Sequence, residues 1–172
     1  MADRPIVTGM FHDPEHADRA YRSLRERGYN EDDVHVVMSK DTRKKYYDRD
    51  EVEIEHGSKA MEGAGAGAAI GGTTGGILGA LAAAGTAVAL PGLGLAIAGP
   101  IAGALAGAGA GGAAGSLVGA LIGAGIPEDR AKVYEKGVKE GGIVVGAHPR
   151  DRDDAEVLAR DFETHGGREV YY

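Results

Sequence analysis

The sequence predicts an α+β fold, in which a small ferredoxin-like α/β domain is interrupted by a long Gly/Ala-rich helical hairpin. Two observations carry this prediction. The chain of 172 residues is charged at both ends, whereas the 65 residues between Glu62 and Glu128 carry no charged side chain. The charged ends alternate short apolar runs with capped helical patterns, which indicates strands and helices in turn. We therefore divide the chain into residues 1–60, 61–126 and 127–172.

The first segment, residues 1–60, reads as a strand, a helix, a second strand and a charged linker. The apolar run at 5–11 predicts the first strand. Asp13 is placed to cap a helix that Pro14 begins and Gly28 ends. The second strand is predicted at 34–37, and the linker at 40–60 contains one more alternating run at 51–55. The face of the helix that should be buried consists of Ala17, Ala20, Tyr21 and Leu24.

The third segment, residues 127–172, reads as helix, strand, helix and strand. The helices are predicted at 127–140 and after a cap at Asp151 or Asp153, and the strands at 143–147 and 170–172. The buried face of the second helix should consist of Ala155, Val157, Leu158 and Phe162. Neither end has enough apolar surface to fold comfortably alone, so we expect both to share one sheet. A parallel α/β sheet is the alternative, because the extra helix leaves strand direction open.

The uncharged segment carries glycine at every fourth position in two series. These are Gly63, Gly67, Gly71, Gly75 and Gly79, and then Gly99, Gly103, Gly107, Gly111, Gly115, Gly119 and Gly123. Inside a helix each glycine costs about 1 kcal/mol relative to alanine. The helical spacing therefore indicates that the missing side chains let helix backbones pack closely. We predict two helices of about 25 residues, joined by a turn at 90–100, whose glycines mediate helix packing and self-association.

Two locations fit such a hairpin. A helix of about 25 residues is about 38 Å long and would cross a hydrocarbon core of about 30 Å. The leading expectation is therefore a hairpin inserted in, or associated with, a lipid bilayer, with both flanks in the cytoplasm. The alternative is a soluble homo-oligomer in which the hairpins bury one another. The beginning of the chain has no signal-peptide pattern, so secretion is not expected.

Few residues point to catalysis or to ligand binding. Residues 107–112 match G-x-G-x-x-G, but no predicted strand precedes them, as a dinucleotide site requires. His12 and His16 lie on either side of a helix cap, so we interpret them as a solvated helix entrance rather than a metal site. His148 is interpreted as a polar strand end. We predict no catalytic residue, cofactor, metal or small-molecule substrate, and the net charge of −7 disfavours nucleic acid as a partner.

Two stretches of the chain resemble a known group of proteins. PIVTGMFHDPEHADRAYRSLRERGYNEDDVHVVM is similar to the N-terminal unit of bacterial general stress proteins of the heat-induced and low-temperature-induced type. GIPEDRAKVYEKGVKEGGIVVGAHP is similar to the segment that follows the glycine-rich insert in the same group. The resemblance implies induction under heat, cold, osmotic or general stress, and it carries no catalytic residues.

The hairpin hypothesis makes two predictions about variants. Replacing residues 61–126 with a short linker should leave a folded α/β domain. Gly111→Leu should dissociate the assembly, because Gly111 lies in the middle of the second glycine series. Gly125 lies outside that series, so Gly125→Leu should be nearly silent.

Overall fold

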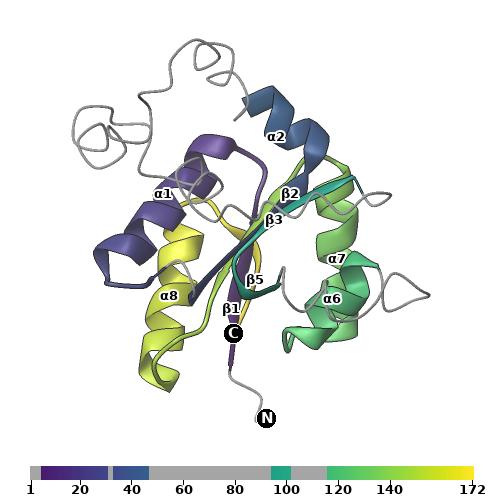
Figure 1. Cartoon of the computed structure of the whole chain (residues 1–172). Helices are drawn as coiled ribbons and strands as arrows, with labels where there is room; N and C mark the ends of the chain where they lie inside the picture. Colours follow the sequence, from purple (N-terminus) through teal and green to yellow (C-terminus); the bar gives the residue numbers. More distant parts are fainter. Residues whose placement is uncertain (1–4, 31–32, 47–93, 102–115) are drawn as a thin grey trace, which may run out of the picture.

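The computed structural model describes residues 5–30, 33–46, 94–101 and 116–172. Within them, a five-stranded antiparallel sheet in the order β3-β2-β4-β1-β5 lies between helices on both faces (Figure 1). The strands are β1 (Val7–Phe11), β2 (Val34–Ser39), β3 (Leu95–Ala98), β4 (Ile143–Ala147) and β5 (Arg168–Tyr171). The helices are α1 (Pro14–Glu26), α2 (Lys40–Tyr46), α6 (Leu117–Gly123), α7 (Glu128–Lys139) and α8 (Arg152–Thr164).

The two charged ends of the chain form one sheet. Strand β4 lies between β1 and β2, and both pairings are antiparallel, with Val7 opposite Ala147 and Val36 opposite Val145. The α+β class is therefore confirmed, and the parallel alternative is wrong. The physical reason is that the two strands of each flank, which a helix connects, are not neighbours in the sheet. A strand of the other flank lies between them and pairs with both in the opposite direction.

Helices α1 and α8 cover the first face of the sheet. The Asp13 carboxylate accepts the Glu15 N–H at 2.8 Å, and the Asp151 carboxylate accepts the Asp154 N–H at 2.8 Å, so both predicted caps are present. The predicted face of α1 is buried throughout. On α8 the prediction is wrong at Val157, which is 36% exposed, because Val157 lies two residues from Ala155 and so faces away from the sheet. Ala159 is buried in its place.

The core on this face, called the first core, contains residues from both flanks and alternate residues of the strands. Its members include Val7, Phe11, Ala17, Tyr21, Leu24, Tyr29, Val36, Met38, Val145, Leu158 and Phe162. The Phe11 and Phe162 rings meet edge to face, with centroids 5.8 Å apart. The first core therefore joins β1 to α8, which lie far apart in the sequence.

Helices α6 and α7 cover the opposite face and enclose the second core. Its members are Ile6, Met10, Val37, Leu95, Ile97, Ile101, Leu117, Ala120, Leu121, Ile126, Ala131, Tyr134, Val138 and Val144. Six of the large aliphatic side chains come from the segment that we predicted to be a separate hairpin: Leu95, Ile97, Ile101, Leu117, Leu121 and Ile126. The last part of that segment therefore belongs to the α+β domain.

The hairpin prediction is wrong for residues 95–98. They were predicted to lie in the turn, but they form β3, which pairs with β2 so that Ile97 lies opposite Val37. The run Leu95–Ala98 is bounded by Gly94 and by Gly99-Pro100. The pairing with β2 buries its side chains alternately in the two cores, which is why a short strand is stable here.

A continuous helix over residues 99–123 is also wrong. Ser116 has an extended backbone, with φ −88° and ψ 159°, and its hydroxyl caps the new helix α6 by accepting the Gly119 N–H at 3.1 Å. After α6, Gly125 has φ +93°, the Gly125 N–H donates to Ile122 O and the Ile126 N–H donates to Leu121 O. This left-handed end favours glycine. A leucine would be strained at this φ, so the structure leads us to expect that Gly125→Leu lowers the stability of the domain.

The other predictions for the insert concern its linker, its first helix, its possible crossing of a membrane and its removal. The alternating run at 51–55 and the first predicted helix, 63–90, lie outside the described residues, while the start of the predicted linker forms α2. None of the described helices has both the length and the apolar character needed to cross a membrane. The prediction that residues 61–126 can be removed without harm conflicts with the second core, because that change would delete β3 and α6.

Candidate functional site

The predicted site is the glycine series, and the structure describes three of its members. Gly63, Gly67, Gly71, Gly75, Gly79, Gly103, Gly107, Gly111 and Gly115 lie outside the described residues. Gly99, Gly119 and Gly123 lie inside them. Gly99 follows β3, whereas Gly119 and Gly123 lie in α6. These three residues therefore do not form one helical row.

Gly99 makes a close backbone contact inside the domain. Its φ is +88°, and a Cβ built on it would lie 2.0 Å from the carbonyl oxygen of Val34. A side chain at this position would therefore collide with the backbone of β2. The requirement for glycine here comes from the seating of residues 99–101 against the beginning of β2, and not from helix packing.

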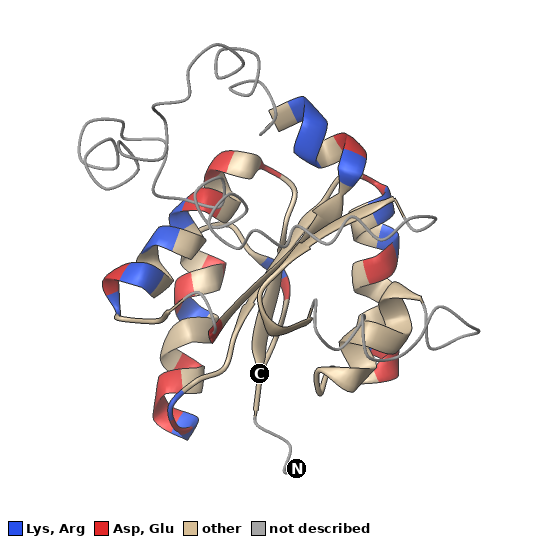
Figure 2. Ribbon diagram, viewed as in Figure 1, with Lys and Arg blue, Asp and Glu red and all other residues tan. Residues whose placement is uncertain are grey.

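Gly119 and Gly123 lie on the outer side of α6. Together with Val118 and Ile122 they form a surface that we call the α6 face. Ile122 is 44% exposed, Val118 and Gly119 are half-buried, and Gly123 is exposed. No described atom lies within 4 Å of a Cβ built on Gly123. Among the described helices, α6 alone carries no charged side chain (Figure 2). Glycines on an uncharged helix face are suited to close approach of another backbone.

The histidines singled out in the sequence do not converge on a metal site. His12 and His16 line a hollow of about 590 Å³ beside Asp13, Gly166, Gly167 and Arg168. The described residues contain no group of three side chains able to hold a metal ion. His148 lies at the end of β4, where its Nδ1 is 3.2 Å from the carbonyl oxygen of Pro5.

His35, which the sequence analysis did not consider, lies beside His148 with ring centroids 4.9 Å apart and the planes at 84°. His35 is 2% exposed, and its Nδ1 accepts the backbone N–H of Ile101 at 3.3 Å. Burial and the neighbouring His148 lower the pKa of His35 to about 3. We call His35, His148, Pro5, Gly99 and Ile101 the histidine corner. Its signal in the sequence is a single ionisable residue within the apolar run of β2.

A buried polar link also crosses the second core. The Tyr134 hydroxyl lies 2.9 Å from the Thr8 hydroxyl and donates to the carbonyl oxygen of Glu169 at 2.6 Å. Burial raises the pKa of Tyr134 to about 12. The link therefore holds α7 to β1 and β5 with a neutral phenol, and it satisfies polar groups that would otherwise be buried without partners.

Tyr29, Arg150 and Asp154 form a polar cluster where the two flanks meet. The Tyr29 hydroxyl donates to the Asp154 carboxylate, and the Arg150 guanidinium lies over the Tyr29 ring at 4.8 Å. Burial, followed by the bond to Asp154, raises the pKa of Tyr29. Burial opposes ionisation of Asp154, but the bonds from Tyr29 and the Arg150 N–H outweigh it and hold the pKa of Asp154 below its usual range.

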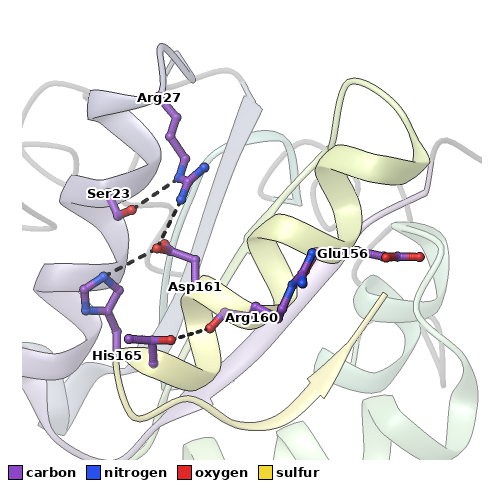
Figure 3. A network of polar contacts seen from close by, with 7 residues as sticks. Ser23, Arg27, Glu156, Arg160, Asp161 and His165 are labelled. Carbon is purple, nitrogen blue, oxygen red and sulfur yellow. Dashed lines mark hydrogen bonds and ion pairs between the residues drawn. The ribbon is translucent and has the colours of Figure 1, made fainter.

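A second set of polar contacts fastens α1 to α8. Figure 3 shows Asp161 between Arg27 and His165; its Oδ1 lies 3.3 Å from Arg27 Nη2 and 3.7 Å from His165 Nε2. Arg27 also donates to the Ser23 hydroxyl at 3.5 Å. Like the cluster around Tyr29, this network joins the two ends of the chain.

Another hollow in the described part of the chain has walls of mixed charge. It has a volume of about 710 Å³ and opens where α2, α6 and α7 meet the start of β3. Lys45 and Lys139 line it together with Asp41 and Glu140. Charges of both signs on one wall do not select a cation or an anion, so this hollow does not indicate one class of ligand.

Comparisons of this chain with models of protein families, with curated proteins and with solved structures found no match.

Proposed function

We propose that this chain is a non-enzymatic general stress-response protein that self-associates through its glycine-rich segments. The stress role rests on the resemblance of the two flanks described above. The self-association role rests on the α6 face, where half-buried Gly119 and exposed Gly123, four residues apart, lie beside the exposed Ile122. An uncharged helix face with glycine at this spacing is suited to close packing against a second helix.

We also propose that the domain is ferredoxin-like. In support, the four strands of the flanks follow the order β2-β4-β1-β5, and all their pairings are antiparallel. Helices α1 and α8 connect β1 to β2 and β4 to β5. The additional elements β3, α6 and α7 then serve as a platform to which the glycine-rich insert is attached.

Part of this platform, β3, interrupts the glycine-rich insert. The described residues end at Tyr46, resume at Gly94, end again at Ile101 and resume at Ser116. Strand β3 therefore separates residues 47–93 from residues 102–115 along the sequence. We propose that the glycine series in both stretches and the α6 face contribute to contacts between copies of the chain.

Among the two locations, the pairing of β2 with β3 favours the soluble assembly. Because these strands share one sheet, the chain departs at Tyr46 and returns at Gly94 on the same side of any bilayer. A return to the same side needs two helical crossings, or about 40 apolar residues. The uncharged run 63–93 falls short of that length, and 102–115 falls short of one crossing. We propose that the domain lies in the cytoplasm in either case.

The test is the oligomeric state of the full chain and of two matched variants. Ile122→Glu places a charge on the α6 face, and Val157→Glu places the same charge on α8, where the parent side chain is similarly exposed. Sedimentation velocity should show an assembly for the parent and Val157→Glu, and at least a tenfold weaker association for Ile122→Glu. A monomeric parent, or equal assembly of all three, contradicts the proposal. A pellet that resists alkaline wash and dissolves in detergent would support the membrane alternative.

A further inference from the structure

His35 is a buried histidine whose two ring nitrogens have different surroundings. Its Nδ1 accepts a hydrogen bond from the backbone N–H of Ile101, whereas its Nε2 has no partner among the described residues. Because Nδ1 accepts, the neutral ring carries its proton on Nε2. The ring therefore holds Ile101 only while it is uncharged.

Among the described residues, the surroundings of His35 offer no charged group placed to stabilise a positive charge. Strands β1, β3 and β4 and helix α6 contain no charged residue, and the ring that faces His35 is His148. At the start of β2, the Asp33 carboxylate accepts the Asn30 N–H. On α7, the Tyr134 hydroxyl is bonded to Thr8 and Glu169, and the charged groups of that helix form pairs such as Arg130–Glu169, Lys132–Glu128 and Lys139–Glu135.

Residues 99–101, which His35 binds through Ile101, are also held by close steric packing. Gly99 lies so close to Val34 that no side chain fits between them, and Ile101 is 1% exposed in the second core. Residues 99–101 therefore reach their place through a backbone contact, an apolar contact and one hydrogen bond to His35. Protonation of His35 would break this hydrogen bond and place a positive charge next to residues 99–101. It would therefore weaken all three contacts together.

We propose that His35 is an acid-sensitive latch, whose protonation releases residues 99–101 from the beginning of β2. A proton on Nδ1 would turn the acceptor into a donor that faces the Ile101 N–H. In the seated state the pKa of His35 is lowered to about 3, whereas a solvated histidine has a pKa of about 6.5. The released state therefore binds the proton more tightly, and acidification from pH 6.5 towards pH 3 favours release.

A metal ion at His35 fits the geometry less well. Metal binding at Nε2 would leave the proton on Nδ1, which again opposes the Ile101 N–H. A third ligand is also missing, since the described residues hold no group of three suitable side chains. The latch, by contrast, needs only a proton, and it does not depend on the proposed self-association.

The test is hydrogen exchange of the Ile101 amide, measured by NMR on the full chain and corrected for the intrinsic effect of pH. Between pH 7 and pH 5 the opening equilibrium should rise by ~25-fold in the parent, as the two pKa values require. In His35→Asn the side-chain oxygen replaces Nδ1 as a neutral acceptor, so the rise should disappear. His12→Asn removes an exposed histidine and should keep the full rise.

Three results would overturn the latch. One is an equal rise in His35→Asn and in the parent. Another is an equal rise at amides of the β1–β4 pair, because the opening would then be global rather than confined to residues 99–101. If His35→Asn does not fold, Gly99→Ala is the second variant, since it disturbs the same seat without removing a titratable group. It should exchange rapidly at Ile101 at pH 7 and lose most of the pH dependence; retention of the ~25-fold rise would contradict the proposal.

Discussion

The two faces of the sheet are covered by helices of different origin. On the first face, α1 and α8 both come from the charged flanks, and their outer sides are charged (Figure 2). On the second face, α7 comes from a charged flank, but α6 comes from the uncharged segment. Both cores nevertheless contain fully buried large side chains. The boundaries of the uncharged segment at Glu62 and Glu128 are therefore not the boundaries of the domain.

The largest expected effect on the stability of the domain comes from removing residues 61–126. A short Gly/Ser linker in their place removes six large aliphatic side chains from the second core, and burying each contributes about 1.5–3 kcal/mol. The summed loss is comparable to a typical domain stability of about 5–15 kcal/mol. We expect circular dichroism and NMR to show an unfolded or loosely packed chain.

The matched control replaces only residues 102–115 with a Gly/Ser linker of equal length. Strand β3 and helix α6 are retained, so the dispersed amide spectrum of the domain should remain. A folded domain after the larger replacement would show that the second core is dispensable, and the platform account would then be wrong.

A smaller effect compares single leucines in the two cores. Leu121 in α6 and Leu158 in α8 are both 0% exposed. Replacing either with alanine should lower the free energy of unfolding by about 2–5 kcal/mol, as measured by chemical denaturation. If Leu158→Ala shows this loss while Leu121→Ala costs under about 1 kcal/mol, α6 is only loosely attached to the second core.

The smallest effect concerns two glycines at the end of α6. Gly125 has φ +93°, so Gly125→Leu should cost about 1–2 kcal/mol through backbone strain. Gly123 is exposed and helical, so Gly123→Leu should be neutral or stabilise the domain by up to about 1 kcal/mol. Thermal unfolding of the two variants gives the comparison, and a silent Gly125→Leu would argue against the left-handed end of α6.

The elements of the flanks could be predicted because their signals are local. Asp13 and Asp151 are caps, Gly28 ends α1, and the apolar positions of α1 repeat with helical spacing. These features act over a few residues and need no knowledge of the rest of the chain. The sharing of one sheet by both flanks could be predicted as well, since neither flank has enough apolar surface alone.

The elements on the second face could not be predicted because their stability depends on distant partners. Strand β3 has four residues, and its pairing with β2 rather than its own pattern sets its conformation. The glycine spacing suggested a single helical row, but Gly99 is required by contact with Val34. His35 was overlooked because its importance comes from His148 and Ile101, which are distant in sequence.

Cross-strand nuclear Overhauser effects between β2 and β3, measured in the full chain, show whether the uncharged segment contributes a strand to the sheet. Our account predicts contacts in the register that places Val36 opposite Ala98, Val37 opposite Ile97 and Met38 opposite Ala96. It also predicts extended chemical shifts over residues 95–98. Helical shifts over these residues, with no cross-strand contact to β2, would contradict the account and restore the uncharged segment as a separate helical unit.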